Sequence, residues 1–363
     1  TWYDLADALF PNGTGTGPLG GVFKRMWAGL FFNRGGGTPL DASGIEAILG
    51  QAGGTGDGAG AARPGSAEDV RCGRFLPEIC DIYQEIAATG KATPEAVELL
   101  RRSSPISVQG RIAIPTLLLQ GQRDSLFPLS HADANARAIA ATGAPVEVAW
   151  FAGGHDGGDG EEEWLTERTV GWFDRYLKSE PGPATAAFTV SRDGGRDPGT
   201  RQRIILHAEA GAYPGLGGTA RRTVPLAGPE QPVANPPGGS PAAISSAPGF
   251  GGLLDGVGGI GVSLDVPGQT AYFESPRLTA PLQVTGAPTV RLRVSGRGEV
   301  TLFAKVYDVA EGRPANLPAG LVAPIRVTVP EEAAETGVEV PVTLPAIDHR
   351  FEVGHRLRLA VTT

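Results

Sequence analysis

Two residues near the middle of the chain have types and spacing suited to proton transfer. Asp124 follows the apolar run 112–121, and His155 follows the next apolar run, 146–151, after two glycines. An imidazole that acts as a general base needs a carboxylate on its second nitrogen, because that contact fixes the tautomer and stabilises the imidazolium. Asp124 and His155 are therefore candidates for the acid and the base of a hydrolytic site.

The segment around these residues is typical of a β-α-β unit. The runs 112–121 and 146–151 are short and apolar, as expected of parallel strands buried on both faces, and a helical segment at 130–141 lies between them. The carboxyl ends of parallel strands lie at one edge of a sheet, so we expect the loops that carry Asp124 and His155 to meet there.

Other polar residues compete for these roles. Asp156 and Asp159 are rival acids, but they lie on the loop of the histidine and are expected to be solvated. A strand followed by Gly-x-x-Asp is also common in loops without any catalytic role, because Gly suits the turn and Asp caps it. His131, near the start of the helical segment, is expected at the surface. The three remaining histidines lie in the β-rich part, have no acidic or cysteine partners at ligand spacing, and predict no metal site: His207, His349 and His355.

The order of acid before histidine matches the last two members of the series Ser, Asp/Glu, His of α/β-hydrolases. No serine in the sequence lies in the Gly-x-Ser-x-Gly pattern of the nucleophile elbow, since Ser43, Ser66 and Ser240 each lack at least one of the two glycines. The elbow also supplies a backbone N–H donor for the oxyanion. We therefore expect the chain by itself to be inactive.

Composition argues against several other classes of protein. Apolar residues make up 41% of the chain and charged residues 19%, with a net charge of -8, which indicates a folded and mildly acidic protein. The basic residues are scattered, so nucleic acid is not an expected partner. No apolar run reaches about 18 residues, so no membrane span is expected, and the proposed chemistry needs no cofactor or metal.

Two cysteines leave the redox environment open. Cys72 and Cys80 lie eight residues apart and fit either a local disulfide or two buried thiols. Extracellular and cytoplasmic locations both stay open, and secretion is favoured if the two residues are bridged.

Hydropathy patterns divide the chain into a helical part, the β-α-β part and a β-rich part. Helical patterns occupy residues 21–32 and 79–86, and a third helix is opened by Thr93 and Pro94. From about residue 185 the pattern changes to period two with Gly/Pro turns, which is typical of a β-sandwich or jelly roll. The Gly/Pro-rich stretch 228–261 is expected to be a surface loop.

Several motifs spread over the chain belong together. They are Trp2–Leu5, Ile114–Asp124, Gly154–His155, Trp172–Leu177, Tyr272–Pro276 and Phe351–Leu359. As a set they resemble the X-prolyl dipeptidyl-peptidase and cocaine-esterase family of serine hydrolases, also called CocE/NonD hydrolases.

The resemblance implies an α/β fold, namely a partial α/β-hydrolase with a helical cap, followed by an all-β jelly-roll sandwich. The implied domains are a hydrolase segment at 1–19, the cap at 20–105, the C-terminal part of the hydrolase at 106–182 and the jelly roll at 185–363. It also implies that Asp124 and His155 are the triad acid and base, and that Trp2 lines the acyl pocket.

In that family the nucleophilic serine and the oxyanion-hole tyrosine precede the segment that Thr1 begins, and the strand motif at 351–363 continues further. Both ends are therefore expected to be truncated, with a complementary chain or preceding segment supplying the nucleophile. The expected function is cleavage of an ester or amide acyl bond in a small-molecule ester or a short peptide. The motifs do not distinguish an X-Pro dipeptidyl-peptidase from an acyl esterase, and they leave the oligomeric state open.

A noncatalytic binding protein is the alternative. In it, residues 185–363 would bind carbohydrate or a protein partner, and the hydrolase part would be a scaffold. An exposed aromatic stripe on the β-rich part would favour this function. The candidate aromatics alternate in a way that suits a core: Tyr213, Tyr272, Phe273, Phe303, Tyr307 and Phe351.

Overall fold

The computed structural model describes residues 1–34, 75–155, 158, 160–180, 185–214, 216, 220–237, 242–246 and 265–363. Cys72, Asp156 and Asp159, and most of the predicted surface loop 228–261, lie outside these residues. Cys80 is buried and disulfide-bonded.

The first part of the chain is helical, as predicted. It contains α1 (Leu5–Leu9), α2 (Arg25–Arg34), α5 (Pro77–Thr89) and α6 (Pro94–Arg102). Asp4 caps α1 by accepting from the Ala6 N–H at 2.8 Å, and Thr93 caps α6 by accepting from the Ala96 N–H at 3.2 Å. Sequence and structure agree here because these side chains satisfy N–H groups that a helix start leaves unpaired.

The helix predicted from residue 21 begins only at Arg25. Gly21 is extended and packs so tightly that a Cβ there would lie 1.9 Å from the Phe10 carbonyl oxygen. The chain therefore passes Phe10 in an extended form before the helix starts.

A four-stranded sheet follows, in the order β1-β2-β3-β4. Its elements are β1 (Thr116–Gly121), α7 (Leu129–Ala140), β2 (Val146–Phe151), α8 (Glu162–Leu177), β3 (Phe188–Arg196) and β4 (Arg203–Ala210). Strands β1, β2 and β3 are parallel, and β4 is antiparallel to β3. The predicted β-α-β unit is confirmed, and both of its strands end at the same edge.

The boundary predicted at residue 185 is wrong, because β3 and β4 belong to this sheet and not to the β-rich domain. β3 pairs with β2 from Phe188 opposite Val148 to Val190 opposite Trp150, and both of its apolar residues are fully buried. The one polar residue between them, Thr189, is buried too and accepts from Arg168 of α8 at 3.2 Å. Phe188, Thr189 and Val190 alternate between apolar and polar residues, which is the pattern of a half-exposed strand. The strand is nevertheless buried, because Thr189 has a hydrogen-bonding partner inside the protein.

The remaining strands form an all-β domain. They are β5 (Thr270–Glu274), β6 (Leu282–Gly286), β7 (Thr289–Val294), β8 (Gly298–Val309), β9 (Ala323–Val329), β10 (Val338–Thr343), β11 (Ile347–Phe351) and β12 (Arg356–Thr362). One sheet has the order β5-β12-β8-β9, and β10 pairs with β7 and β11 with β6. Leu302, Ile325 and Leu359 of the larger sheet share a core with Val340 and Val342 of β10.

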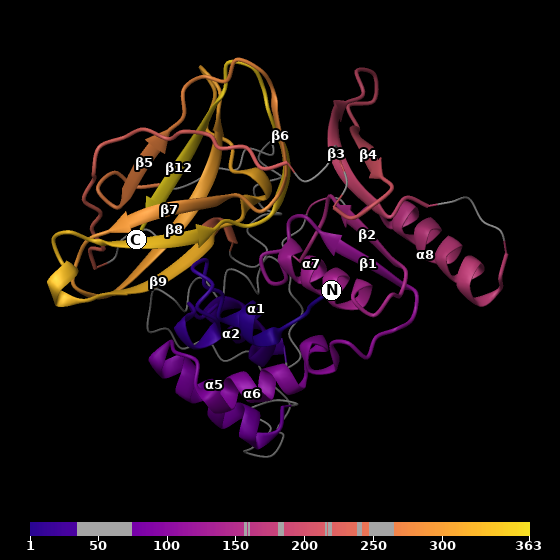
Figure 1. The fold of residues 1–363 in the computed structure, drawn as a ribbon, viewed down its shortest axis with the longest axis horizontal. Helices are drawn as coiled ribbons and strands as arrows, with labels where there is room; N and C mark the ends of the chain where they lie inside the picture. The colour runs from indigo at the N-terminus through magenta and orange to yellow at the C-terminus, as the bar shows by residue number, and fades with distance from the viewer. Residues whose placement is uncertain are drawn as a thin grey trace, which may run out of the picture.

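The three parts pack around the beginning of the chain. In Figure 1 the helices α1, α2, α5 and α6 lie beneath both the parallel sheet and the β domain, and the N-terminus lies beside α7. Gly13 donates to the Pro324 carbonyl and accepts from the Thr343 N–H, each at 2.8 Å, which joins this segment to β9 and β10.

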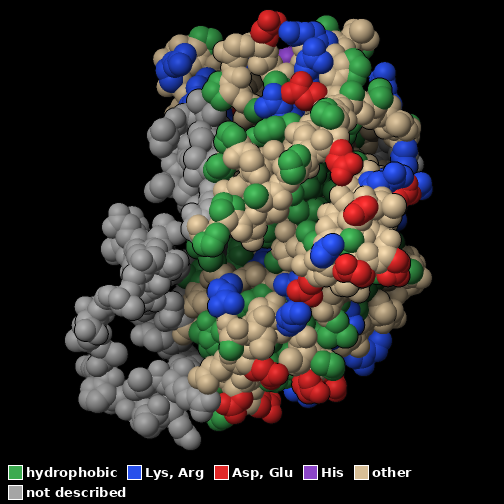
Figure 2. Space-filling view, turned by 90° about the vertical axis from the view of Figure 1, so that its left-hand side faces the viewer, with side chains coloured by type: hydrophobic (Ala, Val, Ile, Leu, Met, Phe, Trp, Pro, Cys, Tyr) green, Lys and Arg blue, Asp and Glu red, His purple; other side chains and the backbone are tan. Residues whose placement is uncertain are grey.

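The surface carries charges of both signs. On the face shown in Figure 2, Lys and Arg side chains are interspersed with Asp and Glu. None of the helices in the described ranges is long and apolar enough to cross a membrane.

Candidate active site

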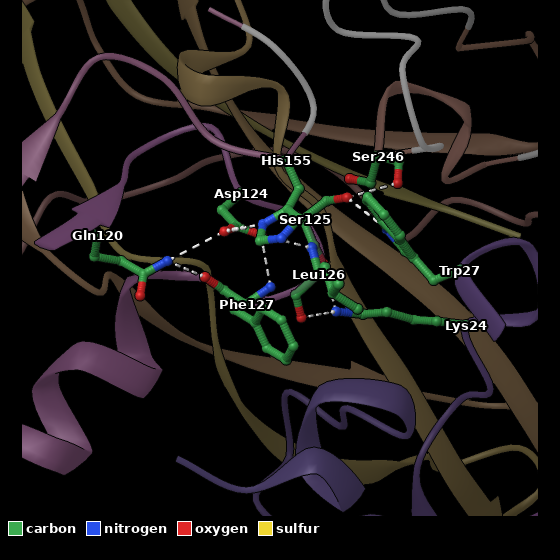
Figure 3. Close-up of polar contacts among 9 residues, drawn as sticks. All are labelled: Lys24, Trp27, Gln120, Asp124, Ser125, Leu126, Phe127, His155 and Ser246. Carbon is green, nitrogen blue, oxygen red and sulfur yellow. Dashed lines mark hydrogen bonds and ion pairs between the residues drawn. The ribbon is translucent and has the colours of Figure 1, made fainter. Parts of the chain in front are cut away.

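Asp124 and His155 meet as the sequence predicted. The Asp124 Oδ2 and His155 Nδ1 atoms lie 2.7 Å apart, and Figure 3 shows the pair at the centre of a group of polar contacts. The two loops continue the pairing of β1 and β2, because the Gln122 N–H donates to Phe151 O at 2.9 Å and the Arg123 N–H donates to Gly153 O at 3.0 Å. The backbone pairing thus holds the two side chains at hydrogen-bonding distance.

Two glycines allow this close approach. A Cβ at Gly121 would lie 2.3 Å from Gly153 O, and a Cβ at Gly154 would lie 2.3 Å from Arg123 O. Real Cβ atoms do not approach carbonyl oxygens so closely, so any larger residue would separate the loops. The Gly-x-x-Asp and Gly-His patterns of the sequence therefore have a steric cause.

The carboxylate of Asp124 is buried and fully engaged, with only 3% of the residue exposed. Its Oδ1 accepts from the backbone N–H groups of Leu126 at 3.1 Å and Phe127 at 2.7 Å. Its Oδ2 accepts from Gln120 Nε2 at 3.2 Å in addition to its contact with His155. A carboxylate has about four acceptor sites, so these four contacts use its full capacity to accept hydrogen bonds.

His155 is the accessible member of the pair, since 49% of its side chain is exposed. Aromatic rings enclose it edge-on: the ring centroid of Trp27 lies at 5.9 Å and that of Phe127 at 5.5 Å. Trp2, predicted to line the acyl pocket, is 41% exposed and lies 6.0 Å from the Phe127 ring. The imidazole is thus held on one side by the buried acid and surrounded by apolar surface.

The loop after Asp124 connects all three parts of the molecule. Trp27 Nε1, from α2, donates to Ser125 Oγ at 3.0 Å, and Ser125 Oγ donates to the Ser246 carbonyl at 2.9 Å. Lys24 Nζ donates to the Leu126 carbonyl at 3.1 Å. The Ser125 hydroxyl thus links α2 to the segment at Ser246.

Sequence reasoning missed several of these residues. Trp27 was interpreted only as the apolar face of a helix, and Gln120, Ser125 and Phe127 received no role. The available signal was position: all three of the latter lie within four residues of the predicted acid.

The prediction that His131 lies at the surface is wrong. His131 is buried in α7, and its Nδ1 accepts from the Tyr3 N–H at 3.1 Å. Burial, and then the nearby charge of Lys24, lower the pKa of His131 to about 4. The ring is therefore a neutral acceptor at pH 7 that fixes the start of the chain against α7.

The other three histidines have acidic partners that lie far from them in the sequence. His207 Nε2 lies 2.7 Å from Glu161 Oε1, while His349 and His355 bind the two oxygens of Asp308 at 2.9 and 2.8 Å. Each pair joins groups from different elements, such as Glu161 at the start of α8 with His207 of β4. Among the described residues, no group of three or more His, Cys, Asp or Glu side chains is arranged to hold a metal ion.

The beginning of the chain lies at the site. Asn135 Nδ2 donates to the Trp2 carbonyl at 2.8 Å. This bond holds the segment at Trp2 against α7.

Comparison with known proteins finds a family match for the β-rich part of the chain. Residues 234–363 match the model of the X-Pro dipeptidyl-peptidase C-terminal non-catalytic domain. No curated protein sequence matches the chain.

Solved structures share the fold at low sequence identity. An aminopeptidase from the marine sediment archaeon Thaumarchaeota archaeon superposes with a TM-score of 0.51 at 14% identity, over 79% of this chain and 53% of that chain. An α-amino acid ester hydrolase superposes with a TM-score of 0.52 at 17% identity, over 78% of this chain and 54% of that chain. A CocE/NonD family hydrolase from Staphylococcus aureus superposes with a TM-score of 0.47 at 12% identity, over 99% of this chain and 58% of that chain.

The chain thus spans about half the length of the structures it matches, and the first two share its fold. The match at residues 234–363 confirms the predicted resemblance of the chain to the X-Pro dipeptidyl-peptidase family.

Proposed function

We propose that this chain is part of a serine hydrolase that transfers the acyl group of an ester or amide to water. The observation that carries the proposal is the 2.7 Å contact between buried Asp124 and half-exposed His155. A general base must be reachable by substrate, while the carboxylate that orients it works best away from water.

In the proposed reaction a serine from outside these 363 residues attacks the carbonyl carbon. His155 takes the proton of that serine through Nε2 and then gives it to the leaving alcohol or amine, while water later repeats the attack and frees the acid. Asp124 stays ionised, keeps the proton of the imidazole on Nδ1 and stabilises the imidazolium in each step.

Features at the edge of the α/β part support a further segment that completes the site. β1 lies at one end of the strand order, and α8 exposes a row of apolar side chains, Val170, Phe173 and Leu177. An open strand edge and an exposed apolar helix face are surfaces that further chain would cover.

The aromatic residues around the base support an apolar acyl group. Trp27 and Phe127 contact the imidazole edge-on, and Trp2 extends the same surface toward solvent. An aromatic wall next to the reacting carbonyl favours burial of an apolar acyl chain or ring. Both a small acyl ester and a short peptide with an apolar residue satisfy this requirement.

The noncatalytic alternative lacks its expected support. The six aromatic side chains that could have formed an exposed stripe are all buried or half-buried. Tyr307 and Phe351, for example, are 1% and 0% exposed.

The test is hydrolysis of p-nitrophenyl acetate by the full-length parent protein. His155→Ala is expected to lower kcat by about 10⁴-fold or more, and Asp124→Asn by about 10⁴-fold through the wrong tautomer. His349→Ala, far along the chain in β11, serves as the matched control and should keep wild-type turnover. Full activity in His155→Ala at an unchanged melting temperature would remove His155 from the mechanism. A mild effect of Asp124→Asn with a large effect of Asp156→Asn would move the acid to the rival position.

A further inference from the structure

We propose that Gln120 is a positioning residue of the acid and base pair, because its buried amide donates to the Asp124 oxygen that holds His155. The inference rests on the proposed function for its catalytic meaning. Its structural content, a control of the Asp124–His155 contact by Gln120, is testable without turnover.

Gln120 lies inside β1 and is 1% exposed. Its Nε2 donates to Asp124 Oδ2 at 3.2 Å and to the Phe127 carbonyl at 2.7 Å, as Figure 3 shows. Its Oε1 is buried without a hydrogen-bond partner among the described residues. The opposite amide orientation would direct Oε1 at two acceptors, so the two contacts of Nε2 fix the orientation.

Packing alone does not explain an amide at this position. A buried, unpaired acceptor is costly, and an apolar side chain of similar shape would avoid that cost. The neighbouring core of the sheet, with Leu118 and Val148, is apolar. The amide is therefore retained for what its N–H groups do at Asp124 and Phe127.

The two oxygens of Asp124 have different surroundings. The backbone of the turn holds Oδ1, through Leu126 and Phe127, whatever side chain occupies position 120. Only Oδ2 is shared, between Gln120 and His155. Gln120 thus competes with the imidazole for the charge on this oxygen and weakens its hold on the imidazolium.

Gln120 also connects the acid to the aromatic wall. The Phe127 carbonyl that accepts from Gln120 belongs to the residue whose ring lies edge-on to His155. Other charged and titratable groups near this region are Lys24, Asp4 and His131. A substitution at position 120 leaves these groups in place.

The chain offers a matched control two residues away. Gln122 Nε2 donates to the Ser191 carbonyl at 2.7 Å and has no contact with the carboxylate among its described hydrogen bonds. Gln120→Met and Gln122→Met each remove one amide while keeping the length of the side chain.

The experiment is an NMR titration of His155 in the folded chain. In Gln120→Met the pH midpoint of the imidazole should rise by about 0.5 units or more, since the carboxylate loses a competing donor, whereas Gln122→Met should stay within about 0.1 units of wild type. An unchanged midpoint in folded Gln120→Met would overturn the inference, because a merely structural amide would change stability and not this titration.

A second measurement decides the matter if Gln120→Met does not fold. In the wild-type chain, the side-chain NH₂ resonances of Gln120 should shift with the same midpoint as His155, and those of Gln122 should not. Absence of this shift overturns the proposal. A failure of the activity test would instead leave both NMR results intact, so the two proposals fail separately.

Discussion

Replacement of Asp124 by Ala should destabilise the α/β part strongly, even though the side chain faces a site and not a core. The carboxylate accepts from the N–H groups of Leu126 and Phe127 and from Gln120. Each buried donor left without an acceptor costs about 1–3 kcal/mol. Water that enters beside the half-exposed His155 offsets part of this cost, so the net loss should be about 3–5 kcal/mol.

Two milder substitutions give the comparison. Asp124→Asn keeps an oxygen at the position of Oδ1 for the two backbone N–H groups, and it should cost only about 1–2 kcal/mol. His155→Ala removes a side chain that is 49% exposed, and it should cost about 1 kcal/mol or less. The expected order of destabilisation is therefore Asp124→Ala, then Asp124→Asn, then His155→Ala.

Urea unfolding followed by tryptophan fluorescence measures these differences, because Trp27 and Trp150 lie in the cores of the affected parts. The chain has several cores, so the transition of the α/β part must be separated from that of the β domain. If His155→Ala were as destabilising as Asp124→Ala, the carboxylate would not be the support of the turn, and the reasoning would be refuted.

Three further predictions concern the surroundings of the site. Gly154→Ala should break the Asp124–His155 contact, because its Cβ would lie 2.3 Å from Arg123 O, and an unaltered contact in a crystal structure of this variant would contradict the steric argument. The lowered pKa of His131, about 4, means that the unfolded chain binds this proton more tightly; stability should therefore fall as the pH drops from about 6.5 to 4, by up to about 1.4 kcal/mol per unit. His131→Asn should reduce that slope in urea titrations, and an identical slope would exclude His131 as its source. Trp27→Phe removes the donor to Ser125 and should cost about 1 kcal/mol in the same assay, whereas no loss would show that this bond adds nothing.

The sequence predicted the β-α-β unit and the meeting of Asp124 with His155 because both depend on local chemistry. The strand 146–151 is buried on both faces and the strand 116–121 is partly to fully buried, and the glycines beside the acid and the base allow the backbones to approach. The predicted cap at Thr93 is confirmed, and it is local too, because its side chain accepts from the Ala96 N–H three residues later.

Features that depend on distant pairing could not be read from the sequence. Thr189 of β3 is buried with a hydrogen bond from Arg168 of α8. The sequence of the strand does not indicate that partner, which lies 21 residues earlier. His131 is buried because the segment at Tyr3, 128 residues earlier, covers it. The jelly-roll order of the β domain stays a prediction, since the structure shows its strands in one four-stranded sheet and two strand pairs.

The central claim is that Asp124 and His155 activate a serine that lies outside this chain. Labelling of the full-length parent with a fluorophosphonate, followed by peptide mass spectrometry, tests it most directly, in wild type and in His155→Ala. The account predicts one modified serine outside the 363 residues, and loss of labelling in the variant. A label on a serine within the 363 residues, or equally fast labelling in His155→Ala, would contradict it.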